Sequence, residues 1–393
     1  MASRNTPDQV KFPSLTHWLE ETLAAMPQRG RMTLKLPHDL AFGFTDDRKT
    51  EKGNQDRVAF AYRLDPSHYG ESWFFAGLCD GVGGEEQGDI AASIAMAEIL
   101  SELCSSDEYS PRARISDAIV RAHSAVGERL HGSATTFAGV LVTARGTITL
   151  GSVGDSRIYS LAQGKAQQLS QDDTLEDMLR RHPSSTNDGQ VQEALQNLKQ
   201  QWKDSLGQAI GGSLPLEPRI KDWPTDTKQA GCLLCTDGVW KTVENVLDQA
   251  VAASGDRQDL ARRLLNLTDL LRSDDNATAV VLPEVSNVIA WLRNKHSLAE
   301  RGLVHIVLPT EALVAPWTLF EKRRSLPAGT RQAVVDHPPS ETPAKSKSKR
   351  KQKNGKPSVI EKDPEVQLTI EEEVRDEPVT TTGSVPKERK GST

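Results

Sequence analysis

The chain has 393 residues, 37% of them hydrophobic, and a formal net charge of -6, which is typical of one large globular domain with appended segments. It contains no apolar stretch near the roughly 18 residues that cross a bilayer, and no basic face of the kind that binds nucleic acid, so we expect neither membrane insertion nor nucleic-acid binding. The four cysteines lie in apolar or helical patterns, which argues against a disulfide framework and predicts a cytoplasmic protein.

The apolar residues follow two periodicities along the chain. Helical spacing predicts amphipathic helices at 89–104, where Ile90, Ile94 and Leu100 share one face, and at 111–131. Short strand-like runs bounded by turn residues occupy 58–62, 73–79, 137–143, 148–153, 158–161, 232–235 and 277–282. Because the helices form an adjacent pair instead of alternating with each strand, the order favours antiparallel sheets with segregated helices. The predicted fold class is α+β.

Composition divides the chain into four parts. From residue 336 onward Pro, Ser, Thr, Lys and Glu dominate, with too little apolar surface to offset the entropy of ordering, so we expect a disordered charged tail. The tail either stays extended in solvent or docks a partner through its charged runs. The predicted parts are an N-terminal extension (1–39), a catalytic domain (40–285), a C-terminal extension of no assigned role (286–335) and the tail (336–393).

Several aspartates stand where apolar strands end or begin. Asp80 and Asp237 follow strands and precede glycine, Asp155 lies in a turn between two strands, and Asp275 comes just before a strand. In antiparallel sheets the end of one strand and the start of its neighbour share a rim, so these side chains could converge. Asp-Gly is also a common turn dipeptide, but the pattern of apolar strand, cysteine and Asp-Gly occurs twice.

Carboxylates gathered on one rim would repel and raise one another's pKa unless a cation lay among them. Oxygen ligands without nearby His or Cys favour hard divalent ions such as Mg²⁺ or Mn²⁺. Two such ions would activate a water and neutralise charge on a phosphoryl group, which favours phosphate ester hydrolysis.

Cys232 and Cys235 form a second candidate metal pair. In a strand of period two these residues point to opposite faces of the sheet and cannot clamp one ion. Since no second cysteine pair accompanies them, zinc is not expected.

The motifs, in chain order, resemble the metal-dependent protein phosphatase 2C family, the PPM Ser/Thr phosphatases, and within it the bacterial-type branch. The resemblance covers roughly residues 40 to 283. The matching motifs are Asn54-Gln55-Asp56, Cys79-Asp80-Gly81-Val82-Gly83-Gly84, Ser133-Ala134-Thr135-Thr136, Gly154-Asp155-Ser156-Arg157-Ile158-Tyr159, Gln208-Ala209-Ile210-Gly211, Cys235-Thr236-Asp237-Gly238-Val239-Trp240 and Asp275-Asn276-Ala277-Thr278.

This resemblance implies a four-layer α-β-β-α sandwich, with two central antiparallel β-sheets flanked by helix pairs and two Mn²⁺ or Mg²⁺ ions at one end. By position, Asp80 would bridge the ions while Asp237 and Asp275 hold one of them. The carbonyl of Gly81 would serve the other ion, and Asp56 would hold a water bound to the ions.

Two departures from the family pattern concern substrate and metal binding. Gln55 stands where many members have a Glu ligand, so the ligands of the second ion would carry one negative charge fewer. The family's phosphate-binding Arg is replaced by Glu51, and Arg48 is the basic residue predicted to reach the phosphate from a longer turn, with an exposed surface charge as the alternative.

A third departure concerns a further ion that many relatives hold. Asp155 and Asp237 match two of its ligands, but Lys241 stands at the third, so a third ion is in doubt. Lys241 shares a helical face with Asp237. Its ammonium either substitutes for the ion beside Asp155 or extends into solvent.

The resemblance and the carboxylates together predict an enzyme that hydrolyses phosphoserine and phosphothreonine in proteins, opposing a bacterial Ser/Thr kinase. A pseudophosphatase that only binds phosphoproteins is the alternative, although a decayed site has no reason to retain Asp56, Asp80, Asp237 and Asp275 together. A scaffold that works through the charged tail is compatible with either.

Overall fold

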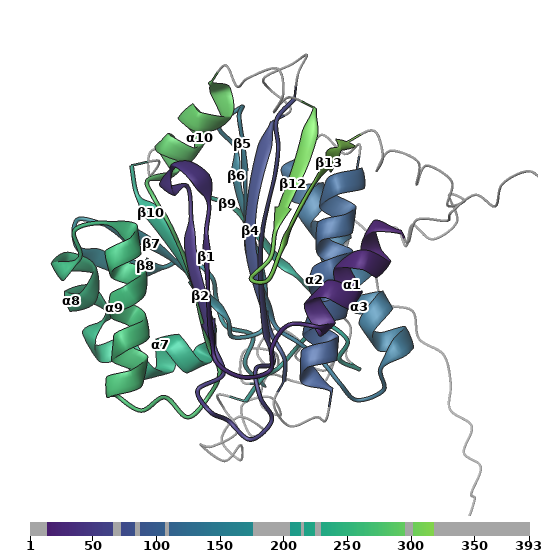
Figure 1. Cartoon of the computed structure of the whole chain (residues 1–393), viewed down its shortest axis with the longest axis horizontal. Coiled ribbons are helices and arrows are strands. Elements are labelled where there is room, and N and C mark those ends of the chain that lie inside the picture. The colour runs from purple at the N-terminus through teal and green to yellow at the C-terminus, as the bar shows by residue number, and fades with distance from the viewer. Residues whose placement is uncertain are drawn as a thin grey trace, which may run out of the picture. The chain divides into compact units, whose positions relative to one another are not determined.

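A computed structural model describes the chain (Figure 1). The described residues are 14–65, 72–82, 87–106, 110–175, 205–213, 216–224, 229–294 and 302–317. All of them belong to the first of two units, residues 1–328. The predicted disordered tail, 336–393, lies outside the described residues. No described helix is both long and apolar enough to cross a bilayer.

The strands form two antiparallel sheets. The first sheet has the order β1-β2-β11-β10-β7-β8, with strands β1 (Arg31–Lys35), β2 (Phe42–Asp46), β7 (Arg157–Ala162), β8 (Lys165–Gln168), β10 (Gly231–Cys235) and β11 (Ala277–Leu282). The second has the order β13-β12-β3-β4-β5-β6-β9, with β3 (Asp56–Arg63), β4 (Trp73–Asp80), β5 (Phe137–Thr143), β6 (Ile148–Val153), β9 (Arg219–Asp222), β12 (Leu303–Val307) and β13 (Ala312–Pro316). Every predicted strand is confirmed to within two residues at each end.

Helices cover the outer face of each sheet, so the predicted α-β-β-α sandwich is confirmed (Figure 1). One outer layer contains α1 (Leu15–Ala24), α2 (Gly88–Ser105) and α3 (Pro111–Arg129); the other contains α7 (Asp237–Val243), α8 (Leu247–Ala253) and α9 (Arg257–Leu270). The described part of each layer contains three helices, one more than the expected pair. The core between the sheets also buries one face of α10 (Val285–Arg293).

The helix α2 differs from the amphipathic helix that its sequence predicts. It packs against α1, α3 and the second sheet, so it is buried on most of its circumference. Ile90, placed by periodicity on the apolar face, is 37% exposed, which makes that assignment wrong. The neighbouring α3 follows prediction: Ser110 caps its N-terminus, Pro111 occupies the first turn, and one apolar stripe is buried.

The two cysteines of β10 lie on opposite faces, as predicted. Cys232 belongs to the core between the sheets, whereas Cys235 belongs to the core between the first sheet and its helices. Both thiols are free and buried. The pair therefore cannot act as one metal clamp.

Segments outside the predicted catalytic domain, 40–285, contribute to the same sandwich. Leu19 and Leu23 of α1 are fully buried against α2, and β1 pairs with β2. Toward the other end, β12 pairs with both β3 and β13. The four-part division remains a prediction, but the described parts of its two extensions pack into the domain.

This packing predicts that the N-terminal helix is required for stability. Leu19→Ala removes a fully buried side chain and should lower the free energy of unfolding by about 2–5 kcal/mol. The matched control is Val120→Ala on α3, where the side chain is 47% exposed and the expected change is within about 0.5 kcal/mol. Urea denaturation of the full chain measures both. Equal, small effects would show that α1 is not part of the core.

Candidate active site

Five aspartates meet at one end of the sandwich. Asp56 begins β3 and Asp80 ends β4, and the two are opposite each other in the strand register. Asp237 begins α7 directly after β10, Asp275 lies just before β11, and Asp155 lies between β6 and β7. The charge of Asp80 interacts with those of all four others. The structure therefore brings together the five carboxylates that the sequence predicts, here called the carboxylate cluster.

Asp56 is the most deeply buried member of the cluster. It is fully inaccessible to solvent, and the Thr236 hydroxyl donates a 3.1 Å hydrogen bond to its Oδ2 atom. Burial, together with repulsion from Asp275 and Asp237, raises the pKa of Asp56 to about 7.

The other members are also difficult to ionise. Burial, reinforced by the neighbouring carboxylates, holds the pKa of Asp80 well above its usual range. Burial and the charge of Asp237 raise the pKa of Asp155 to about 6, despite a favourable effect of Lys241. Burial and Asp237 also raise the pKa of Asp275. The cluster as a whole is short of positive charge.

Two oxygens of the cluster lack partners among the described residues. These are Oδ1 of Asp56 and Oδ1 of Asp237, both buried without a hydrogen bond. Buried anionic oxygens without donors are costly and fit coordination to a hard cation. In the described parts of the chain no three acidic, His or Cys side chains are close enough to enclose an ion as they stand.

Glycine permits the close backbone contacts around the cluster. A Cβ atom at Gly81 would clash with the backbone of Gly88, and one at Gly238 would clash with the carbonyl of Asn276. The Gly81 N–H donates to the carbonyl of Gln55, 3.3 Å away, so the residue after Asp80 is tied to the residue before Asp56. The predicted roles of the Gly81 carbonyl and the Gln55 amide as ligands stay predictions.

Lys241 is the one described residue that forms an ion pair with a member of the cluster. Its Nζ lies 2.6 Å from Oδ2 of Asp237 and 3.6 Å from Oδ2 of Asp155. The predicted contact between the Lys241 ammonium and these two carboxylates is confirmed, and the alternative of a free side chain in solvent is wrong.

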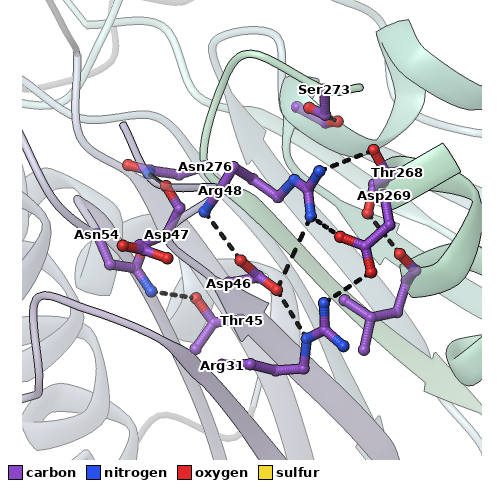
Figure 2. A network of polar contacts seen from close by, with 12 residues as sticks. Arg31, Thr45, Asp46, Asp47, Arg48, Asn54, Thr268, Asp269, Ser273 and Asn276 are labelled. Carbon is purple, nitrogen blue, oxygen red and sulfur yellow. Dashed lines mark hydrogen bonds and ion pairs between the residues drawn. The ribbon is translucent and has the colours of Figure 1, made fainter. Parts of the chain in front are cut away.

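Arg48 lies outside this cluster in its contacts. Its guanidinium bonds to the carboxylate of Asp269 and to the carbonyl of Thr268, and the side chain is 10% exposed. Figure 2 shows the side chain extending toward these residues of α9. The phosphate-binding role that the sequence predicts for Arg48 stays a prediction, and this arrangement does not support it.

The sequence interpretation missed residues that support the cluster. Thr236 bonds to Asp56, and its hydroxyl also accepts the Thr278 N–H at 3.0 Å. Trp240 donates from Nε1 to the carbonyl of Asp155, at 2.9 Å. Thr236 and Trp240 stand beside Asp237 in one motif, and this position is the only sequence signal for a supporting role. Their partners, Asp56 and Asp155, lie far away in the sequence.

Comparison with known families identifies the family of the chain. The model of the protein phosphatase 2C family matches residues 45–272, which is more than half of the chain and includes four of the five cluster residues. The chain belongs to the protein phosphatase 2C family, a family of protein-serine/threonine phosphatases. The search of curated proteins found no match to the sequence.

Solved bacterial phosphatases are similar to the chain at low identity. The PPM Ser-Thr phosphatase MsPP of Mycobacterium smegmatis, in complex with cacodylate, is 22% identical, with 64% of this chain and 99% of that one covered and a TM-score of 0.47. The S. agalactiae serine/threonine phosphatase is 20% identical, with 64% of this chain and 98% of that one covered and a TM-score of 0.49. The catalytic domain of the serine threonine protein phosphatase PstP, in complex with two manganese ions, is 22% identical, with 64% of this chain and 98% of that one covered and a TM-score of 0.46.

The raised pKa values predict how pH affects the metal-free protein. The pKa of Asp56 is about 7 in the folded state and near 3.9 when unfolded, so between about pH 4 and pH 7 the folded state binds more protons. Stability in EDTA should fall as pH rises through this window. Thermal unfolding from pH 5 to pH 8 measures it.

Asp56→Asn should reduce this pH dependence, because it removes one of the groups whose pKa is raised. The control Asp39→Asn changes an acid that is 83% exposed and should behave as wild type. The same slope in wild type and Asp56→Asn would contradict the assignment.

Proposed function

We propose that the chain hydrolyses phosphoserine and phosphothreonine in proteins, using two Mn²⁺ or Mg²⁺ ions held by the carboxylate cluster. The observation that carries this proposal is the pair of buried carboxylate oxygens without partners among the described residues, within a cluster whose pKa values are raised. Family membership supports the reaction class.

The proposed roles follow from position and burial. Asp80, Asp237 and Asp275 would hold the ions, with the Gly81 carbonyl as a further ligand. When bound, two divalent ions lower the pKa of a water and neutralise phosphoryl charge during in-line attack. The buried carboxylate of Asp56, to which the Thr236 hydroxyl donates a hydrogen bond, would orient a water bound to the ions.

A pseudophosphatase that binds phosphoproteins without turnover is the second candidate. The weakened metal position at Gln55 and the engagement of Arg48 with Asp269 favour it. The cost of keeping five repelling carboxylates together argues for the enzyme, because a binding module gains nothing from that cost.

The wider setting is also a proposal. A phosphorylated protein is the substrate, a cognate bacterial Ser/Thr kinase supplies it, and signalling in the cytoplasm is the process. The tail, 336–393, would dock a partner through its basic and acidic runs.

Loss of a cluster carboxylate should abolish most of the turnover. Asp80→Asn and Asp237→Asn should each reduce Mn²⁺-dependent hydrolysis of an aryl phosphate and of a phosphothreonine peptide at least about a hundredfold, because each removes a proposed ligand. Asp39→Asn, the exposed control, should retain full activity. Undiminished activity in Asp80→Asn would contradict the site, and no wild-type turnover with any metal would favour the pseudophosphatase.

Lys241 should limit the number of ions bound. Calorimetric titration of the wild type should give two Mn²⁺ per chain, because position 241 carries an ammonium paired with Asp155 and Asp237 and lacks the carboxylate that a third ion would need. Lys241→Asp should add a third, weaker ion. The control Lys241→Met removes the ammonium without adding a ligand and should still bind two. Three ions in the wild type would show that Lys241 does not replace one.

A further inference from the structure

The turn between β2 and β3, residues 47–55 and here called the β2–β3 turn, leads directly into Asp56. It contains Arg48, and polar side chains from other parts of the chain hold it (Figure 2). The figure shows the Arg48 side chain reaching across to Thr268 and Asp269 at the C-terminal end of α9.

Arg48 makes two kinds of contact with α9. Its Nη1 bonds to the Asp269 carboxylate, and its Nη2 donates to the carbonyl of Thr268 at 3.0 Å. The last carbonyls of a helix have no partner within the helix, and a cation there is stabilising. The backbone N–H of Arg48 also donates to Oδ1 of Asp46, at 2.8 Å. Arg48 therefore joins the turn to the end of the helix.

Arg31 braces the same two acids from β1. Its Nε donates to Oδ2 of Asp46 at 2.7 Å, and its Nη2 lies 2.9 Å from Oδ2 of Asp269. Among the described residues Arg31 forms no hydrogen bond or ion pair with the β2–β3 turn, so it offers a matched control for Arg48.

Asn276 holds the inner side of the turn. Its Oδ1 accepts the N–H of Gln55 at 2.8 Å, and its Nδ2 lies 2.9 Å from the carbonyl of Asp47 and 3.0 Å from that of Gly53. The residue is 4% exposed. Because residue 276 follows Asp275 and the turn leads into Asp56, these bonds fix the positions of Asp275 and Asp56 relative to each other.

The helix end that Arg48 binds is connected to the cluster by the chain that follows it. The carbonyl of Thr268 also accepts the N–H of Ser273, at 2.9 Å. The hydroxyl of Ser273 donates to the carbonyl of Gly238, at 2.7 Å, next to Asp237. The contact of Arg48 thus reaches the segments that carry Asp237 and Asp275.

The backbone of the turn needs this support. Arg48 and Lys49 have φ angles of 49° and 60°, in the left-handed region that non-glycine residues adopt at a cost. Two such residues in succession persist only where the surrounding contacts hold them.

We propose that Arg48 is a positioning residue: it fastens the β2–β3 turn to α9 and so sets Asp56 relative to Asp237 and Asp275. It acts through the carboxylate cluster and does not bind the substrate phosphate. The kinetic test of this proposal rests on the phosphatase activity proposed above. The test by Mn²⁺ binding does not depend on that activity.

A double-mutant cycle of Arg48→Ala and Asp269→Ala tests this role. Each single variant should lower kcat for an aryl phosphate about tenfold and leave KM within about twofold, and the double variant should be no worse than either, because the contact between Arg48 and Asp269 is lost in all three. Arg48→Lys, which keeps the ion pair, should retain most of the wild-type kcat. Arg31→Ala should stay within about twofold of wild type.

A phosphate ligand would behave differently. A KM that rises at least about tenfold in Arg48→Ala, with Asp269→Ala unchanged or improved, would overturn the proposal, because Asp269→Ala frees the guanidinium. Calorimetry measures Mn²⁺ affinity for the same set of variants. Equal losses of affinity in the two single variants, with no further loss in the double variant, support the proposal. Additive losses, or no loss of affinity, overturn it. If the wild type turns over no phosphate ester, the proposed function fails and this binding cycle still decides the role of Arg48.

Discussion

Mutual repulsion among five carboxylates is the constraint around which this end of the sandwich is built. Burial and like charge raise the pKa of Asp56 to about 7 and hold that of Asp80 well above its usual range. In the absence of cations such a cluster destabilises the folded state, and the packing of two sheets and two helical layers has to offset this loss of stability. Stability given up at one site in this way is characteristic of function.

The supporting structure addresses this constraint in three ways. Strand register sets Asp56 opposite Asp80, at the adjoining ends of two buried strands. Lys241 supplies one fixed positive charge to Asp237 and Asp155. Hydrogen bonds from neutral side chains, such as that of Thr236, orient the carboxylates without neutralising them. The buried Oδ1 atoms of Asp56 and Asp237 remain without a hydrogen-bond donor among the described residues.

Much of the fold and the cluster could be predicted because their signals are local. Apolar runs bounded by turn residues located β5, β6 and β11, and the Asp-Gly turns located Asp80 and Asp237. Short or polar edge strands such as β8 and β9 have no such pattern and were not predicted. The direction of a side chain was also out of reach: Asp269, the partner of Arg48, lies 221 residues further along the chain.

The central claim is that the cluster is a cation site that destabilises the metal-free protein. Thermal unfolding of wild type and Asp80→Asn, each in EDTA and in excess Mn²⁺ at pH 8, tests it most directly. The account predicts opposite effects: Asp80→Asn raises the midpoint in EDTA, because a repelling carboxylate is gone, and loses most of the rise that Mn²⁺ gives the wild type. A variant that is less stable in EDTA, or that Mn²⁺ stabilises as much as the wild type, would contradict it.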